Sequence, residues 1–121
     1  MEKLQAPKKF KNDLEERTAL FARRVRAFVR ELPKSTASLE DGKQLIRSSG
    51  SVGANYIEAN ESLSKKDFLV RAKICRKEAK ETRYWLSMFD ILPPALSKER
   101  DSLIQEATEF LRIFSAIISK F

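Results

Sequence analysis

The sequence contains no histidine, one cysteine, three glycines and four prolines in 121 residues. Without histidine the chain lacks the commonest general base and metal ligand, which excludes every catalytic or metal site that depends on imidazole. A lone cysteine, Cys75, cannot form an intramolecular disulfide or a thiolate cluster, and its place in an apolar register predicts a packed thiol. Glycine and proline are too scarce for the turns of a β-sandwich or β-barrel, so a helical fold is expected.

Long apolar runs are also missing from the chain. No segment is apolar over the length that a membrane-spanning helix needs. The N-terminal stretch MEKLQAPKKFKNDLEERT lacks the apolar core of a signal peptide. The sequence therefore predicts a cytoplasmic protein with no membrane partner. Its length suits a single domain over residues 1–121.

The net charge is +7 and is unevenly distributed. Residues 1–35 and 63–92 are net positive, residues 36–62 are net negative, and residues 93–121 are balanced. Such clustering favours a polyanionic partner such as RNA or DNA, although many basic proteins bind none.

Four segments place apolar residues alternately three and four positions apart, which is the period of an amphipathic helix. We predict helices over about 12–32, 37–62, 65–91 and 98–120. The short connections between them indicate an all-α fold, a single-domain antiparallel up-down-up-down four-helix bundle. Polar residues that can cap a helix N-terminus occur at each start. They are Asn12 or Asp13, the pair Ser38 and Asp41, the pair Ser64 and Asp67, and Ser97.

The same periodicity predicts the core of the bundle. Its residues are Leu14, Thr18, Phe21, Val25, Phe28, Leu32, Leu45, Ser49, Val52, Tyr56, Ala59, Leu63, Phe68, Ala72, Cys75, Ala79, Thr82, Leu86, Phe89, Leu103, Ala107, Phe110, Phe114, Ile117 and Phe121. The fourth helix carries a second apolar stripe, formed by Ile104, Leu111 and Ile118. This wide apolar face either broadens the contact with the core or meets another subunit, so the three residues are candidates for an oligomer interface.

The second helix contains the unusually polar stretch IRSSGSVGANYIEANES, residues 46–62. Its polar stripe consists of Ser48, Ser51, Asn55, Glu58 and Ser62, with Gly50 and Gly53 beside it. One interpretation is an exposed polar face. The other is the close approach of a further helix, because a glycine in a helix interior costs about 1 kcal/mol and needs a compensating contact.

Helices two and three are expected to form a hairpin that turns at residues 63 and 64, which makes their charged positions face each other. The residues of this interhelical polar network are Arg47, Asn55, Glu58, Arg71, Glu78 and Glu81. This register places Arg47 across from Lys80 and within a turn of both Glu78 and Glu81, and Glu58 within a turn of Arg71. We expect ion pairs at both levels. Their main effect would be to fix the register, because buried charges are costly unless they are paired.

Glu78 and Glu81 also form a Glu-x-x-Glu motif, which is a possible active-site arrangement. A di-iron bundle needs two Glu-x-x-His motifs and two further glutamates, so the match fails without histidine. Hydrolysis by paired carboxylates has no second motif in its support. We therefore expect a protein that is not an enzyme and that has no cofactor, metal or small-molecule substrate.

Two of the helices carry basic residues at helical spacing. The candidate nucleic-acid-binding residues are Arg23, Arg26, Arg30, Lys73, Arg76, Lys80 and Arg83. One such stripe alone is typical of a solvated face, whereas two on net-positive segments favour phosphate contacts. No recognition-helix motif, zinc finger or aromatic platform accompanies them, so little sequence preference is expected.

Residues 44–86 contain the motifs QLIRS, SVGANYIEA, SKKDF and KEAKETRYWL, and the first helix contains DLEERTALFARRVRAFV. With these motifs the chain resembles the 23S rRNA-intervening sequence proteins, a bacterial family of four-helix bundles. Where many members have Asn-Ile-Ala-Glu-Gly, this chain has Asn-Tyr-Ile-Glu-Ala at residues 55–59. The resemblance implies a ring-like homo-oligomer, a pentamer, with no established activity. A distant relative that accompanies retroelement reverse transcriptases is a basic pentamer that binds nucleic acid.

Two functions stay open from the sequence. The first is a homo-oligomer that binds nucleic acid, RNA in preference to DNA, through its basic helix faces. The second is a structural or protein-interaction module in which Ile104, Leu111 and Ile118 recruit a partner and the positive charge serves solubility. Enzymatic activity ranks third.

Overall fold

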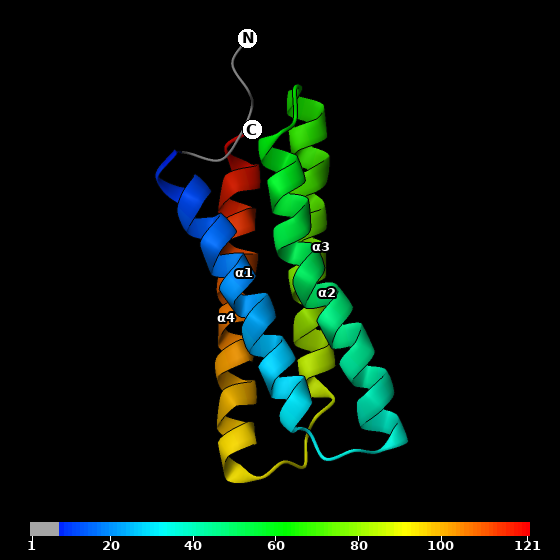
Figure 1. Cartoon of the computed structure of the whole chain (residues 1–121). Coiled ribbons are helices and arrows are strands. Elements are labelled where there is room, and N and C mark those ends of the chain that lie inside the picture. The colour runs from blue at the N-terminus through cyan, green and yellow to red at the C-terminus, as the bar shows by residue number, and fades with distance from the viewer. Residues whose placement is uncertain (1–7) are drawn as a thin grey trace.

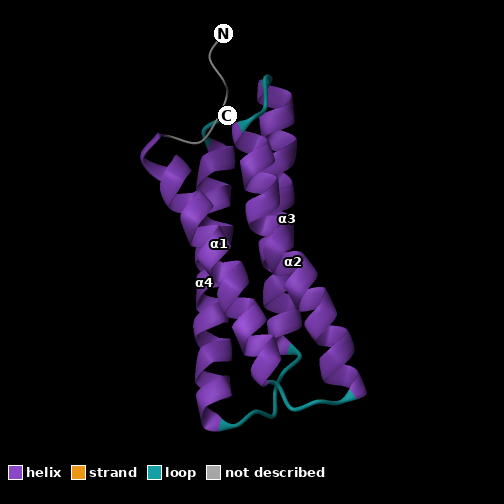
Figure 2. Ribbon diagram, viewed as in Figure 1, coloured by secondary structure: helices purple, strands orange, loops and turns teal. Residues whose placement is uncertain are grey.

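A computed structural model describes residues 8–121, with side chains from residue 14 onward. It contains four helices, α1 (Lys8–Glu31), α2 (Thr36–Asn60), α3 (Lys65–Ser87) and α4 (Pro94–Ser119) (Figure 1). No strand occurs in this part of the chain, and short loops join consecutive helices (Figure 2). Each helix runs antiparallel to the next, which confirms the predicted all-α four-helix bundle. Within residues 8–121, no helix is both long and apolar enough to cross a lipid bilayer.

The helices pack in a square in which each contacts its sequence neighbours, and α4 closes the bundle against α1. The contact between α1 and α4 is the least extensive of these. Over their described lengths, the backbones of α1 and α3 do not approach each other closely, so the two helices occupy diagonal corners. This arrangement decides which basic side chains can share a surface.

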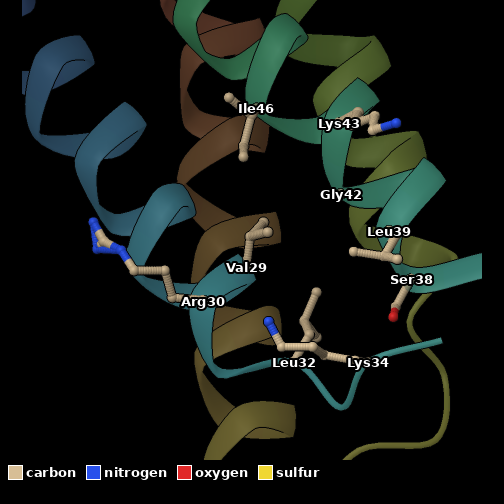
Figure 3. A pocket seen from close by; sticks show the side chains of 9 residues that line it. All are labelled: Val29, Arg30, Leu32, Lys34, Ser38, Leu39, Gly42, Lys43 and Ile46. Carbon is tan, nitrogen blue, oxygen red and sulfur yellow. The ribbon is translucent and has the colours of Figure 1, made fainter. Parts of the chain in front are cut away.

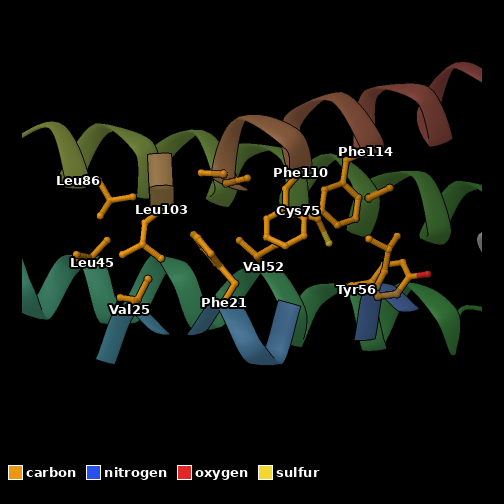
Figure 4. Close-up of a cluster of buried hydrophobic side chains, with 14 of the residues drawn as sticks. Phe21, Val25, Leu45, Val52, Tyr56, Cys75, Leu86, Leu103, Phe110 and Phe114 are labelled. Carbon is orange, nitrogen blue, oxygen red and sulfur yellow. The ribbon is translucent and has the colours of Figure 1, made fainter. Parts of the chain in front are cut away.

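The core forms along the predicted register, and nearly every residue of that register is buried (Figure 4). Aromatic rings pack edge to face across it, as for Phe21 and Phe110, whose ring centroids lie 5.3 Å apart. The buried hydroxyls of Thr18, Ser49 and Thr82 hydrogen-bond to backbone carbonyls of the preceding turn. These polar members of the register are therefore satisfied within their own helices.

Two positions of the predicted register are wrong, and both lie at helix ends. Leu63 is 64% exposed, and Ser62 is buried in its place. Because α2 ends at Asn60, the helical period no longer sets the direction of these side chains. Phe121 is also exposed because it follows the end of α4, although its ring still packs against Phe68 at 5.1 Å between centroids.

α2 begins at Thr36, within one residue of the predicted start, but its cap is not the predicted Ser38. Ser35 is the N-cap, and its Oγ accepts a hydrogen bond from the backbone N–H of Ser38 at 3.1 Å. In return, the Oγ of Ser38 accepts one from the backbone N–H of Ser35 at 3.0 Å. Ser38 therefore belongs to a capping box as its third helical residue and not as its cap. Ser64 caps α3 as predicted, since its Oγ accepts from the N–H of Asp67.

The remaining boundaries also differ from the prediction. α4 begins at Pro94 and not after Ser97, because proline is favoured at the first helical position, where its missing N–H costs nothing. α3 ends at Ser87, four residues earlier than expected. α1 begins at Lys8, so Asn12 and Asp13 lie inside the helix and do not cap it. The side chains of these two residues lie outside the described ones.

Candidate nucleic-acid interface

Five basic side chains of α3 line a groove between α3 and α4, here called the α3–α4 groove. Its volume is about 510 Å³, and its lining residues are Lys73, Arg76, Lys77, Lys80, Arg83 and Leu111. Consecutive basic residues are one, three or four positions apart, so α3 presents them on one face. Lys77 was not predicted from the sequence, although its spacing from Lys73 and Lys80 fits the same stripe.

Hydroxyl groups of α4 lie opposite two of the arginines. Nη1 of Arg76 is 3.5 Å from Oγ of Ser115, and Nη1 of Arg83 is 3.4 Å from Oγ1 of Thr108. Both contacts are long for N–H···O hydrogen bonds and are correspondingly weak. They direct the two guanidinium groups toward α4 and leave most of their donors available to a ligand.

The acidic side chains of α3 lie on a different face from the basic ones. Glu78 and Glu81 contact Arg47 of α2. Among the described side chains, no carboxylate lies within ion-pair distance of the five cations in the α3–α4 groove. The positive charge of the groove is therefore not neutralised by an ion pair with any described side chain.

The groove has the chemistry of a phosphate-binding surface. Residues 73–83 extend over about 15 Å of helix, which matches about five phosphates along one strand of a duplex. No aromatic side chain lines the groove, so it offers no platform on which unpaired bases could stack. Contacts of this kind hold a nucleic-acid backbone without reading its sequence.

The other predicted stripe, formed by Arg23, Arg26 and Arg30 and here called the α1 stripe, does not join the α3–α4 groove. All three side chains are exposed. Arg26 extends toward α2, where its Nη2 lies 3.9 Å from the position of a Cβ atom built on Gly50. Because α1 and α3 are diagonal, the two predicted basic stripes do not form one continuous surface.

Arg47 connects α2 to both glutamates of α3. Its Nη1 lies 3.3 Å from Oε1 of Glu78, and its Nη2 contacts Glu81. Partial burial opposes the charge of Arg47, but the hydrogen bonds and charges of the two carboxylates outweigh it and raise the arginine pKa. Burial, followed by the hydrogen bond with Glu81, raises the pKa of Glu78 despite the nearby guanidinium. The two carboxylates therefore share one cation.

The second expected ion pair of the polar network is absent from the described side chains. Nη1 of Arg71 donates a hydrogen bond to Oδ1 of Asn55 at 3.0 Å, and Arg71 forms no ion pair with Glu58. Asn55 lies one turn earlier on α2 and also donates to the backbone carbonyl of Ser51. The predicted level of Arg71 along α2 is right to within a turn, but its partner is an amide and not a carboxylate.

The glycines of α2 allow close approach of α1 and not of α3. A Cβ atom on Gly53 would lie 2.7 Å from Oγ1 of Thr18, and one on Gly42 would lie 3.2 Å from Cγ1 of Val29. The nearest atom to such a Cβ on Gly50 is 3.9 Å away. The stretch 46–62 is thus neither a fully exposed polar face nor a contact with α3 alone.

Two ion pairs between α1 and α4 were missed from the sequence. Arg17 pairs with Glu106, and Arg24 pairs with Glu99 and also donates to Ser102. Both arginines and both glutamates are seven residues apart, and the levels match in an antiparallel pair of helices. The pairing rule that was applied to α2 and α3 starts from the turn that joins them, and α1 and α4 share no turn from which the register could be set.

The apolar stripe of α4 that was predicted as an oligomer interface contributes partly to the core. Ile104, Leu111 and Ile118 are half-buried and pack against core residues, and Leu111 also lines the α3–α4 groove. Cys75 is fully buried, and burial raises the pKa of its thiol to about 12, as expected for a packed thiol. In the described part of the chain, no group of three acidic or cysteine side chains is arranged to hold a metal ion.

Comparison with known proteins supports the resemblance seen in the sequence. The profile of the 23S rRNA-intervening sequence protein family matches residues 11–116. The fold is similar to a solved structure from Bacteroides thetaiotaomicron, a protein of unknown function from the S23 ribosomal protein family, with a TM-score of 0.79. The sequences are 28% identical over 90% of this chain and 97% of that one. No curated protein matches. Because the family match covers most of its length, the chain belongs to the 23S rRNA-intervening sequence protein family.

Proposed function

We propose that this protein is a non-enzymatic nucleic-acid-binding protein that contacts RNA in preference to DNA through the α3–α4 groove. The observation that carries the proposal is the set of five basic side chains on one face, none of which forms an ion pair with a described carboxylate. Each neutralised phosphate releases counterions, so such a surface binds by charge and with little sequence preference.

The preference for RNA rests on the family of this protein and on its similar structure. The family takes its name from 23S rRNA, and the relative from Bacteroides thetaiotaomicron is assigned to a ribosomal protein family. The groove itself selects phosphate and not sugar. The choice between RNA and DNA therefore needs a direct comparison of the two duplexes.

We also propose that the protein acts as a homo-oligomer, and the family resemblance favours a pentamer. The half-buried Ile104 and Ile118 leave part of their apolar surface free for a subunit contact. Several copies of a weak groove on one assembly would bind one RNA with increased avidity. Light scattering coupled to size exclusion measures the subunit number, and a monomer at high concentration would contradict this part.

A titration monitored by fluorescence anisotropy tests whether the α3–α4 groove binds nucleic acid. It uses a short labelled RNA duplex and the matching DNA duplex. Five phosphate contacts give a slope of about −4 to −5 when the logarithm of the binding constant is plotted against that of salt concentration. The triple variant Lys73→Gln, Lys77→Gln, Lys80→Gln should reduce the slope by about three. The matched control Arg23→Gln, Arg26→Gln, Arg30→Gln removes the same charge from the α1 stripe and should leave the slope unchanged.

Three results would contradict the proposal. Absence of binding at low salt would remove it, and so would binding that is insensitive to salt. Equal losses in the two triple variants would mean that overall charge, and not the α3–α4 groove, attracts the nucleic acid.

A further inference from the structure

A second groove lies between the end of α1 and the first half of α2, here called the α1–α2 groove. Its volume is about 310 Å³. The side chains of Val29, Leu39 and Ile46 point into it from the two helices (Figure 3). Leu39 is 55% exposed, so much of this apolar surface faces solvent. The α1–α2 groove is separate from the α3–α4 groove, with which it shares no residue.

Gly42 of α2 lies in the wall of the α1–α2 groove next to Val29. A Cβ atom at residue 42 would come within 3.2 Å of Cγ1 of Val29, so the glycine lets the two helices approach closely at this point. The apolar floor of the groove therefore lies against a tight contact between α1 and α2.

Positive charge surrounds the apolar floor. Arg30, Lys34 and Lys43 line the α1–α2 groove, and none of its described lining residues is acidic. Figure 3 shows Arg30 and Lys43 extending outward on its two sides. Lys43 has one partner, Glu40, at 3.5 Å, but both side chains are largely exposed, so that ion pair contributes little. Arg30 and Lys34 have no carboxylate partner among the described side chains.

We propose that the α1–α2 groove binds a short acidic segment of a partner protein. One or two large apolar side chains of that segment would fill the floor, and flanking carboxylates would pair with Arg30, Lys34 and Lys43. This division between a desolvated apolar centre and a charged rim is that of protein interfaces. RNA carries the required negative charge but has no aliphatic group to bury against Leu39. A long acyl chain would extend beyond a groove of this size.

Fluorescence anisotropy tests the proposal with two labelled peptides, EEDEFLEDEE and its anchorless counterpart EEDEAAEDEE. The first should bind the full-length protein at least fivefold more tightly than the second. Leu39→Gln should weaken the first peptide by a similar factor. Leu20→Gln is the matched control, because Leu20 on α1 is exposed to the same extent at 56%. Circular dichroism checks that both variants fold, and Lys34→Glu provides a second, polar variant with the same expectation.

Methyl NMR spectra locate the binding. The first peptide should shift the signals of Val29, Leu39 and Ile46, and the RNA duplex should not. Equal binding of the two peptides would overturn the proposal, because it would reduce the contact to non-specific charge. It would also be overturned if no peptide shifted these signals at about 1 mM, the weak limit of specific recognition. RNA-induced shifts at the same methyl groups would assign the groove to nucleic acid instead.

Discussion

Arg17 of α1 donates two hydrogen bonds to the carboxylate of Glu106 on α4. The Nε–Oε2 and Nη2–Oε1 distances are both 2.7 Å. The arginine also lies over the ring of Phe110, 5.3 Å from its centroid. These hydrogen bonds raise the pKa of Arg17 above its usual value despite partial burial. Because α1 and α4 form the least extensive helix contact, this bidentate pair supplies much of the specific connection between them.

Arg17→Met should lower the free energy of unfolding by about 1 kcal/mol, since a bidentate pair with its aromatic contact exceeds an ordinary surface ion pair. Urea denaturation measures the change. Combination with Glu106→Gln in a double-mutant cycle isolates the coupling between the two side chains. Arg112→Met is the control, because its pair with Glu109 lies within α4 and is exposed. A coupling energy near zero would show that the pair is held only by the packing around it.

The glycines of α2 predict opposite effects of the same substitution. Gly50→Ala should stabilise the protein by about 0.5–1 kcal/mol, because alanine favours the helix and the nearest atom, on Arg26, is distant. Gly53→Ala should destabilise it by about 1–3 kcal/mol, because its methyl group would collide with the buried Thr18. Thermal unfolding of both variants compares them directly. If Gly53→Ala were also stabilising, α1 would have to be able to move away from α2.

Arg47→Ala should destabilise the protein by about 2 kcal/mol at pH 7, because it leaves Glu78 and Glu81 without their shared cation. The folded pKa of Glu78 is raised above its ordinary value of 4.5, so the contribution of this residue to stability is greatest below that pH. It declines as pH rises through the folded pKa, because the unfolded state then binds fewer protons. The loss caused by Arg47→Ala should therefore be smaller at pH 4 than at pH 7.

Melting temperatures measured at both pH values test this dependence. Adding Glu78→Gln to the Arg47→Ala variant should recover stability at pH 7, since the neutral amide needs no cation. The same loss at both pH values, or no recovery by the glutamine, would show that Arg47 acts through packing alone.

Cys75 should not react with iodoacetamide in the folded protein at pH 8. Its side chain is fully buried and its thiol pKa is about 12, so the reactive thiolate is both rare and inaccessible. Mass spectrometry detects a single adduct without ambiguity, because the sequence has one cysteine. Reaction in urea is the positive control. Rapid reaction of the folded protein would indicate frequent opening of the α2–α3 pair.

The interior of the bundle could be predicted from the sequence, because each helix buries one face and its period is fixed by helical geometry. Leu63 and Phe121 were misplaced where that geometry stops. The contacts of Arg47 were predictable from distance to the turn. The same rule could not choose Asn55 over Glu58 as the partner of Arg71, because it fixes a level along the helix but not the rotamer.

The candidate interface was only partly predictable. The basic stripe of α3 follows from spacing alone, and the structure adds Lys77 to it. The separation of this stripe from the α1 stripe depends on which helices are diagonal, which periodicity does not reveal. The α1–α2 groove was not anticipated, because it depends on how side chains of two helices meet, which periodicity does not reveal.

α3 carries basic residues on one face and acidic residues on another. Both faces keep their partners only if the length of the helix is kept, whereas individual residues can change. Exchange of lysine for arginine within residues 73–83 would keep every positive charge in the α3–α4 groove. Insertion of one residue near Ile74 would rotate all that follows by about 100°. This rotation would turn Lys80 and Arg83 away from the groove. It would also move Glu78 and Glu81 away from Arg47. Homologues of this chain should therefore tolerate changes of residue in α3 and length changes only in the loops on either side.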